Sequence, residues 1–205
     1  MKKALLGKKI GMMQYICDNG IVIPVTVCEL GPCVVVQKKT VENDGYSALK
    51  VGYSDCKEKR IATPQRKELE KNEIKPKKVL KEIAVFDDAL QVGSTIDCSI
   101  FEENQTVEVS GISKGRGFAG VIKRHGFGGG RATHGSHFHR APGSVGACAY
   151  PGKIWKGQKM PGRYGSIKVT VKNLKIVKIF QDKNIVLISG ALPGTKNSLI
   201  TVSAK

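Results

Sequence analysis

The strongest constraint on this chain is a stretch of 73 residues, 109–181, that holds 14 lysines and arginines and not one aspartate or glutamate. The rest of the chain contains all 17 acids, and residues 1–108 are close to neutral, with 17 basic and 16 acidic side chains. A solvated protein surface normally mixes the two signs, because like charges gathered together repel each other. The stretch therefore favours a polyanionic partner, whose condensed counterions are released when lysine and arginine neutralise its phosphates.

A glycine-rich segment, 111–165, lies within this stretch and contains 15 of the 24 glycines, all four histidines and the single tryptophan. Its apolar residues follow neither the helical period of 3.6 nor the strand period of 2. Such a segment buries too little apolar surface to offset the entropy of ordering it alone. It is also far longer than an ordinary loop. We predict a mostly irregular basic arm at 111–165, inserted into a body formed by 1–110 and 166–205.

The body reads as mainly β. β-Branched and alternating apolar patterns predict strands on both sides of the arm, and Gly31-Pro32 and Asn43-Asp44-Gly45 are turn or breaker signals. One short, highly charged surface helix is expected at 63–72, with Thr63 as its N-cap and Pro64 as its first residue. The fold class predicted is a barrel-like β body with this helical excursion. The expected strands are 20–30, 33–37, 47–53, 81–86, 95–101, 106–110, 167–172, 174–180, 184–189 and 199–202.

Membrane and export classes are disfavoured by the apolar pattern. No apolar run approaches the roughly 18–20 residues of a spanning helix, and Gly7, Lys8 and Lys9 interrupt an N-terminal apolar stretch that is too short for a signal peptide. We expect a cytoplasmic protein whose cysteines stay free thiols. No CxxC pair occurs among Cys17, Cys28, Cys33, Cys56, Cys98 and Cys148, which argues against a zinc-finger site.

The segment Gly115-Arg-Gly-Phe-Ala-Gly120 matches the GxGxxG pattern of dinucleotide-binding turns. That fold needs a helix next and an acid about twenty residues further on, which binds the ribose. Four glycines between 126 and 130 argue against a proper helix, and the next acid is Asp182. We interpret the glycines as backbone that must approach phosphates closely, where Cβ atoms would obstruct. The glycines assigned this role are Gly115, Gly117, Gly120, Gly143 and Gly146.

Three histidines within six residues, His134, His137 and His139, could hold a metal ion, with Cys148 as a possible fourth ligand. No carboxylate lies near them in the sequence, although metal-ligating histidines usually have one as an orienting partner. The interpretation we favour uses rings to stack on unpaired bases and cations to pair with phosphates, without metal or cofactor. Besides these histidines, the predicted RNA-binding set is Lys114, Arg116, Lys123, Arg124, Arg131, Arg140, Lys153, Trp155, Lys156, Lys159 and Arg163.

Other functional classes are weakly supported. Ser136 and Ser144 have no acid in the arm to complete a catalytic triad, and there is no GxxxxGK[ST] loop, so no catalytic residues are assigned. Two alternatives remain open. An enzyme centred on the histidines or on GxGxxG would bind a metal or a dinucleotide, and a DNA-packaging protein would bind duplex DNA as tightly as structured RNA.

Motifs along nearly the whole chain carry a family resemblance. The most specific is GISKGRGFAGVIKR at 111–124, followed by matches at 132–135, 139–146, 151–153 and 156–162. Residues 6–12, 169–174 and 191–194 also fit. In these residues the chain resembles the universal large-subunit ribosomal protein number three, in its bacterial form.

The resemblance implies a body built as the six-stranded barrel shared by translation proteins. It implies that the protein binds large-subunit (23S-type) rRNA near its 3′ end, helps to start subunit assembly, and has other large-subunit proteins as neighbours. The arm would thread toward the peptidyl transferase centre, with its tip near 143–151. Some bacterial members carry a methylated glutamine at this tip; here 146–150 reads Gly-Ala-Cys-Ala-Tyr, so that modification is not expected at this site.

Overall fold

The structure is a computed structural model that describes residues 3–17, 19–84 and 90–204. The chain divides into two compact units. We call the first, Met1–Ile112 with Lys168–Lys205, the body, and the second, Ser113–Ile167, the inserted unit. None of the helices described is long and apolar enough to cross a membrane.

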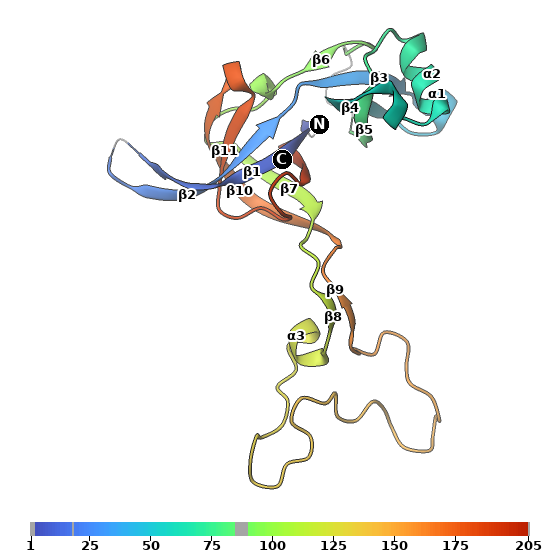
Figure 1. The fold of residues 1–205 in the computed structure, drawn as a ribbon, viewed down its shortest axis with the longest axis vertical. Helices are drawn as coiled ribbons and strands as arrows, with labels where there is room; N and C mark the ends of the chain where they lie inside the picture. Colours follow the sequence, from blue (N-terminus) through green and yellow to red (C-terminus); the bar gives the residue numbers. More distant parts are fainter. Residues whose placement is uncertain (1–2, 18, 85–89, 205) are drawn as a thin grey trace. The chain divides into compact units, whose positions relative to one another are not determined.

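Six strands of the body close into a barrel (Figure 1). Their order is β1-β12-β7-β10-β11-β2, and each neighbouring pair is antiparallel. The mainly β class and the six-stranded barrel are therefore confirmed. The strands are β1 (Ala4–Ile16), β2 (Val22–Leu30), β7 (Thr106–Ile112), β10 (Lys168–Phe180), β11 (Ile185–Ser189) and β12 (Leu199–Ala204).

The barrel core follows from the two-residue alternation of its strands. On β12 the side chains of Ile200, Val202 and Ala204 are buried, whereas the residues between them are only half-buried. Leu5 and Leu6 of β1 join the same buried cluster. Apolar burial of this kind is the main favourable contribution to folding.

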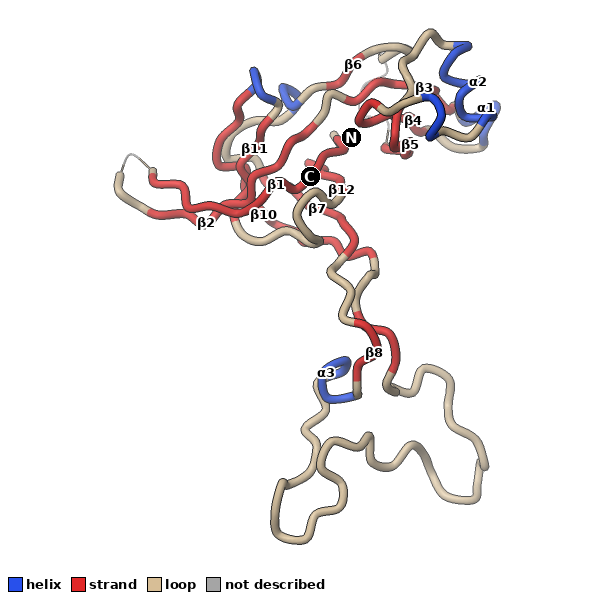
Figure 2. The backbone as a smooth tube through the Cα atoms, in the orientation of Figure 1, coloured by secondary structure: helices blue, strands red, loops and turns tan. Residues whose placement is uncertain are grey.

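A four-stranded sheet, order β5-β4-β3-β6, shares that core with the barrel. Its strands are β3 (Cys33–Lys39), β4 (Ala48–Asp55), β5 (Lys77–Ile83) and β6 (Thr95–Ile96). Helices α1 (Val41–Asp44) and α2 (Thr63–Lys71) belong to the same region, and short 3₁₀ turns occupy Glu58–Arg60, Cys98–Ile100 and Gln181–Lys183 (Figure 2). The sequence did not predict this second sheet as a separate layer.

Several local predictions need correction. β1 was not predicted at all, and β10 is one strand with register shifts rather than two strands. The strand expected at 95–101 is only β6 followed by a 3₁₀ turn. Helix α2 begins at Thr63, so Ala62 is its N-cap and gives no side-chain cap. Asn43–Gly45 closes a short helix, and residues 85–86 of the strand expected at 81–86 lie outside the described residues.

All six cysteines are free thiols, and three of them are buried in the body. Burial raises the pKa of Cys28 to about 12 and that of Cys33 to about 11, so both stay protonated at neutral pH. Such thiols pack as small hydrophobes. Cys148, in the inserted unit, is exposed.

Close strand packing explains one glycine of β1. Gly7 is paired with Ile200 on one side and Leu30 on the other. A Cβ at Gly7 would lie against the carbonyl oxygen of Glu29 and 2.5 Å from Leu30 Cδ2. At Gly11, further along the same strand, a Cβ would meet nothing within 4 Å.

We therefore expect Gly7→Ala to lower the free energy of unfolding by about 1–3 kcal/mol, because the added methyl overpacks the β1–β2 pair. Gly11→Ala is the matched control and is expected to change stability by no more than about 0.5 kcal/mol. Urea unfolding of the purified proteins, followed by circular dichroism, measures both. Equal stability of the two variants would contradict the close approach.

Candidate nucleic-acid interface

The inserted unit begins and ends at neighbouring strands of the barrel. In the body, Ile112 of β7 pairs with Lys168 of β10. Within the unit, the Ser113 N–H donates to the Ile167 carbonyl at 2.9 Å, and the pairing continues from β8 (Gly117–Ala119) to β9 (Gly162–Tyr164). The ends of the unit are thus held side by side by backbone hydrogen bonds.

The GxGxxG segment contains β8 itself, paired antiparallel with β9. It leads into α3 (Val121–His125), a helix of five residues that ends at Gly126 with φ 74°. A dinucleotide turn instead joins a parallel strand to a long crossover helix. The local topology here therefore differs from that of a nucleotide-binding βαβ unit.

Arg124 connects the two halves of the inserted unit. Its Nη1 donates to the Met160 carbonyl at 2.6 Å, and His125 Nε2 lies 3.1 Å from the same oxygen. A Cβ at Gly162 would lie 2.6 Å from Arg124 Nη1, so glycine leaves room for the guanidinium. Arg124 is half-buried and commits one donor to the protein, although a guanidinium has five N–H donors in all.

Residues 126–161 contain no helix or strand and are organised by turns (Figure 2). The Gly130 N–H donates to the His139 carbonyl at 2.7 Å, and His139 Nδ1 lies 3.0 Å from the Arg131 carbonyl. The Phe138 ring packs closely against Gly130 and Gly143. His139 is therefore partly engaged within the unit.

The other basic residues predicted to bind RNA are exposed. None of the 14 basic side chains of 109–181 forms an ion pair with a carboxylate of the described residues. The ion pairs that are present lie around the four-stranded sheet, for example Lys50–Glu68 at 2.5 Å. The exposed cations are Lys114, Arg116, Lys123, Arg131, Arg140, Lys153, Lys156, Lys159 and Arg163.

Several rings of the inserted unit face solvent. Trp155 is 60% exposed and Tyr150 is 90% exposed. Lys153 Nζ lies 5.4 Å from the Trp155 ring centroid, a cation–π distance. Phe118, 79% exposed on β8 opposite Arg163, was not among the predicted binding residues, although a large apolar side chain beside GxG is a usable signal.

The structure does not assemble the predicted histidines as metal ligands. His134, His137 and His139 are all exposed. Within the described part of the chain, no three His, Cys, Asp or Glu side chains are grouped so that they could hold a metal ion.

The five glycines assigned to close phosphate approach fall into two groups. A Cβ at Gly115 would lie 2.7 Å from Ser166 Oγ, and Gly117 and Gly143 have φ of 68° and 77°, so these three have reasons within the protein to be glycine. Gly120 has open space around its Cα, and the nearest atom to a Cβ at Gly146 is 4.0 Å away. Gly120 and Gly146 are therefore the two of the five that have exposed backbone and no contact or positive φ that requires glycine.

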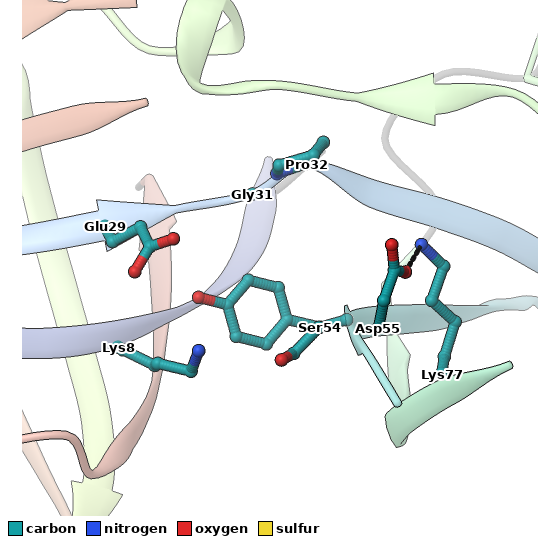
Figure 3. A pocket seen from close by; sticks show the side chains of 8 residues that line it. Lys8, Glu29, Gly31, Pro32, Ser54, Asp55 and Lys77 are labelled. Carbon is teal, nitrogen blue, oxygen red and sulfur yellow. Dashed lines mark hydrogen bonds and ion pairs between the residues drawn. The ribbon is translucent and has the colours of Figure 1, made fainter. Parts of the chain in front are cut away.

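A pocket of about 230 Å³ in the body mixes both charge signs (Figure 3). Lys77 Nζ lies 2.5 Å from Asp55 Oδ1, and Lys8 Nζ lies 5.5 Å from the Tyr53 ring centroid. Glu29 also lines the pocket. Burial raises the pKa of the Tyr53 hydroxyl, and Glu29 raises it further. Two carboxylates beside two lysines give this pocket no preference for a polyanion.

Comparison with known proteins decides the family. The sequence profile of the family described as ribosomal protein L3 matches residues 78–185. A relative from Heliobacterium modesticaldum (strain ATCC 51547 / Ice1), described as large ribosomal subunit protein uL3, is 48% identical over 204 residues, which cover 99% of this chain and 97% of the relative. This chain belongs to the ribosomal protein L3 family. The resemblance carried by the motifs is confirmed, and the L3 family is one of ribosomal structural proteins rather than of enzymes.

One glycine that sequence reasoning missed holds the inserted unit of this L3-family chain together. Gly165 has φ 75°, and a Cβ there would lie against the Lys114 carbonyl oxygen. Alanine would therefore be strained both in its backbone and by this contact. At Gly128, by contrast, a Cβ would meet nothing within 4 Å and φ is not positive.

We expect Gly165→Ala to loosen the base of the inserted unit by about 1–3 kcal/mol. Trypsin is then expected to cut after Lys114 and Arg116 roughly tenfold faster, since 1.4 kcal/mol is a factor of ten in the population of open states. Mass spectrometry of timed digests measures the rates, with Gly128→Ala as the control. Indistinguishable digestion of the two variants would refute the role of Gly165.

Proposed function

We propose that this protein is a structural component of the large ribosomal subunit and binds large-subunit (23S-type) rRNA directly through the inserted unit. The observation that carries the proposal is the set of exposed lysines and arginines that have no ion-pair partner among the described carboxylates. A phosphate backbone supplies the missing negative charge, and its counterions are released on binding. The name of the H. modesticaldum relative, a large-subunit protein, supports the location.

The side chains of the unit would divide the work of binding. Phosphate contacts by lysine and arginine position a protein on nucleic acid, while contacts to bases provide specificity. Trp155, Tyr150 and Phe118 present exposed faces on which unpaired bases can stack. The exposed histidines, His134 and His137, add donors beside them. Gly120 and Gly146 leave backbone open to a phosphate.

We also propose that the inserted unit is the rRNA-threading arm predicted from the sequence, and that its segment 143–151 reaches toward the peptidyl transferase centre. The body would bind near the 3′ end of the rRNA and help to start assembly, beside neighbouring large-subunit proteins on the cytoplasmic ribosome. The family motifs at 111–124 and 139–146 support this role. So does the scarcity of buried apolar residues in the unit, where Ala119 and Val121 are the buried hydrophobics described.

Salt dependence tests the phosphate contacts. We expect Arg116→Gln/Lys123→Gln to reduce the slope of log affinity against log salt concentration by about 0.7–0.9 for each lost phosphate contact. Both side chains are exposed, so the fold is expected to persist. Filter binding of full-length protein to large-subunit rRNA measures the slope, and Lys57→Gln/Lys59→Gln in the body is the control. An unchanged slope in the first variant would remove these residues from the interface.

Protection from protease tests the RNA assignment as a whole. We expect trypsin to cut free protein first between Lys114 and Arg163, because the basic residues there are exposed and residues 126–161 form no helix or strand. We expect rRNA to suppress these cuts at least tenfold. Duplex DNA at equal phosphate concentration is the control. Equal digestion with and without rRNA would refute the proposed function, and equal protection by DNA would favour the packaging alternative.

A further inference from the structure

A second concentration of positive charge lies in the body, outside the inserted unit. A cavity of about 190 Å³ lies between the edge strand β5 and the barrel strands β7, β10 and β12. We call it the Lys81–Lys168 cavity. Its polar lining comprises Lys81, Glu82, Ser110, Lys168, Thr201 and Ser203. The two ammonium groups come from β5 and β10, and the hydroxyls come from β7 and β12.

Lys81 is held in this cavity at an electrostatic cost. Its Nζ donates to Thr201 Oγ1 at 2.7 Å, and the side chain is partly buried. Burial lowers the pKa of Lys81, and the neighbouring positive charge of Lys168 lowers it further. Both effects mean that the charged ammonium is disfavoured where it stands. An anion in the cavity would act in the opposite direction and favour the charged ammonium.

Glu82, the carboxylate among the lining residues, is engaged by other side chains. Glu82 Oε1 lies 3.0 Å from Lys39 Nζ, and Glu82 Oε2 accepts a hydrogen bond from the Tyr46 hydroxyl at 2.9 Å. Glu108, two residues before Ser110 on β7, takes part in an interaction and is not among the residues that line the cavity. The pKa of Lys81 accordingly shows no raising influence from a carboxylate. The charge of the lysine pair is therefore left for a ligand to balance.

We propose that the Lys81–Lys168 cavity binds a single phosphate group of the rRNA backbone and gives the body its own anchoring point on the RNA. Two ammonium groups and three hydroxyls converge there, and both kinds of group contact phosphate oxygens in nucleic-acid complexes. At about 190 Å³ the cavity is smaller than the roughly 300–1,000 Å³ of small-molecule sites, so it suits one phosphate rather than a whole nucleotide.

The proposal rests on the proposed rRNA-binding function, but it concerns different residues. The mixed-charge pocket of Figure 3 is the contrasting case, because two carboxylates, Glu29 and Asp55, line it. The Lys81–Lys168 cavity is lined by one, Glu82, which is ion-paired with Lys39. Lys168 lies in the acid-free stretch 109–181, whereas Lys81 lies in the nearly neutral part of the chain. The two lysines are far apart in the sequence, and the arrangement of β5 and β10 brings them close to each other.

The first test measures rRNA affinity of the full-length protein against KCl concentration. Lys81→Gln/Lys168→Gln is expected to reduce the log–log slope by about 0.7–0.9, which corresponds to about five- to eightfold weaker binding at 0.1 M salt. Lys67→Gln/Lys183→Gln removes two exposed lysines of the body and is the control for net charge. Thermal unfolding shows whether the loss of Lys81 impairs folding. If it does, Lys168→Gln alone, at an exposed position, tests the same cavity in a folded protein.

The second test is acetylation footprinting of the unaltered protein by mass spectrometry, alone, with rRNA, and with inorganic phosphate at the same phosphate concentration. We expect rRNA to slow acetylation of Lys81 and Lys168 at least fivefold and inorganic phosphate to have little effect. The cavity proposal would be overturned, and the proposed function would stand, if the protein bound rRNA without this protection of Lys81 and Lys168. The same holds if Lys81→Gln/Lys168→Gln left the salt dependence of rRNA binding unchanged. Equal protection by inorganic phosphate would overturn the assignment of this cavity to a phosphate of the rRNA backbone. Failure of the unaltered protein to bind rRNA would overturn the proposed function itself.

Discussion

Closure of the six-stranded barrel is the constraint on which the rest of the structure depends. β1 pairs with β12, so the beginning and the end of the described chain share one ladder. β7 pairs with both β12 and β10. A closed ladder leaves no free edge that could pair with other chains. It also fixes Ile112 beside Lys168, so a long insertion can leave and re-enter the body without breaking a hydrogen-bonded pair.

The inserted unit is not held together by an apolar core. It has few buried apolar side chains, and backbone hydrogen bonds, glycine contacts and Arg124 hold its segments together. Its exposed cations repel one another without nearby acids to offset them. A polyanionic partner of the kind proposed above would therefore also stabilise this unit. The body has the opposite character, because it has an apolar core and its lysines and carboxylates form ion pairs with each other.

The differences between the predicted and the observed elements have identifiable physical causes. β1 was missed because Gly7, Lys8 and Lys9 interrupt its apolar pattern, although Lys9 is buried and its Nζ donates to the Leu192 carbonyl at 2.8 Å. The four-stranded sheet was not separated from the barrel, because strand patterns report alternation and not partners. Thr63 suits an N-cap chemically, yet the first helical turn begins there and Ala62 is the cap. Local preference was overridden by tertiary context in each case.

The sequence by itself determined the mainly β class, the acid-free basic stretch, the six-stranded barrel through its family motifs, and the family. The class and the basic stretch follow from composition and local pattern, which are properties of neighbouring residues. The barrel and the family follow from the resemblance that the motifs carry. Only the tertiary structure decided that Arg124 and His139 are partly engaged within the protein, that Gly165 cannot carry a side chain, and that Lys81 lies near Lys168. Strand pairing and packing bring together residues far apart in the chain, and no local pattern encodes which strands will meet.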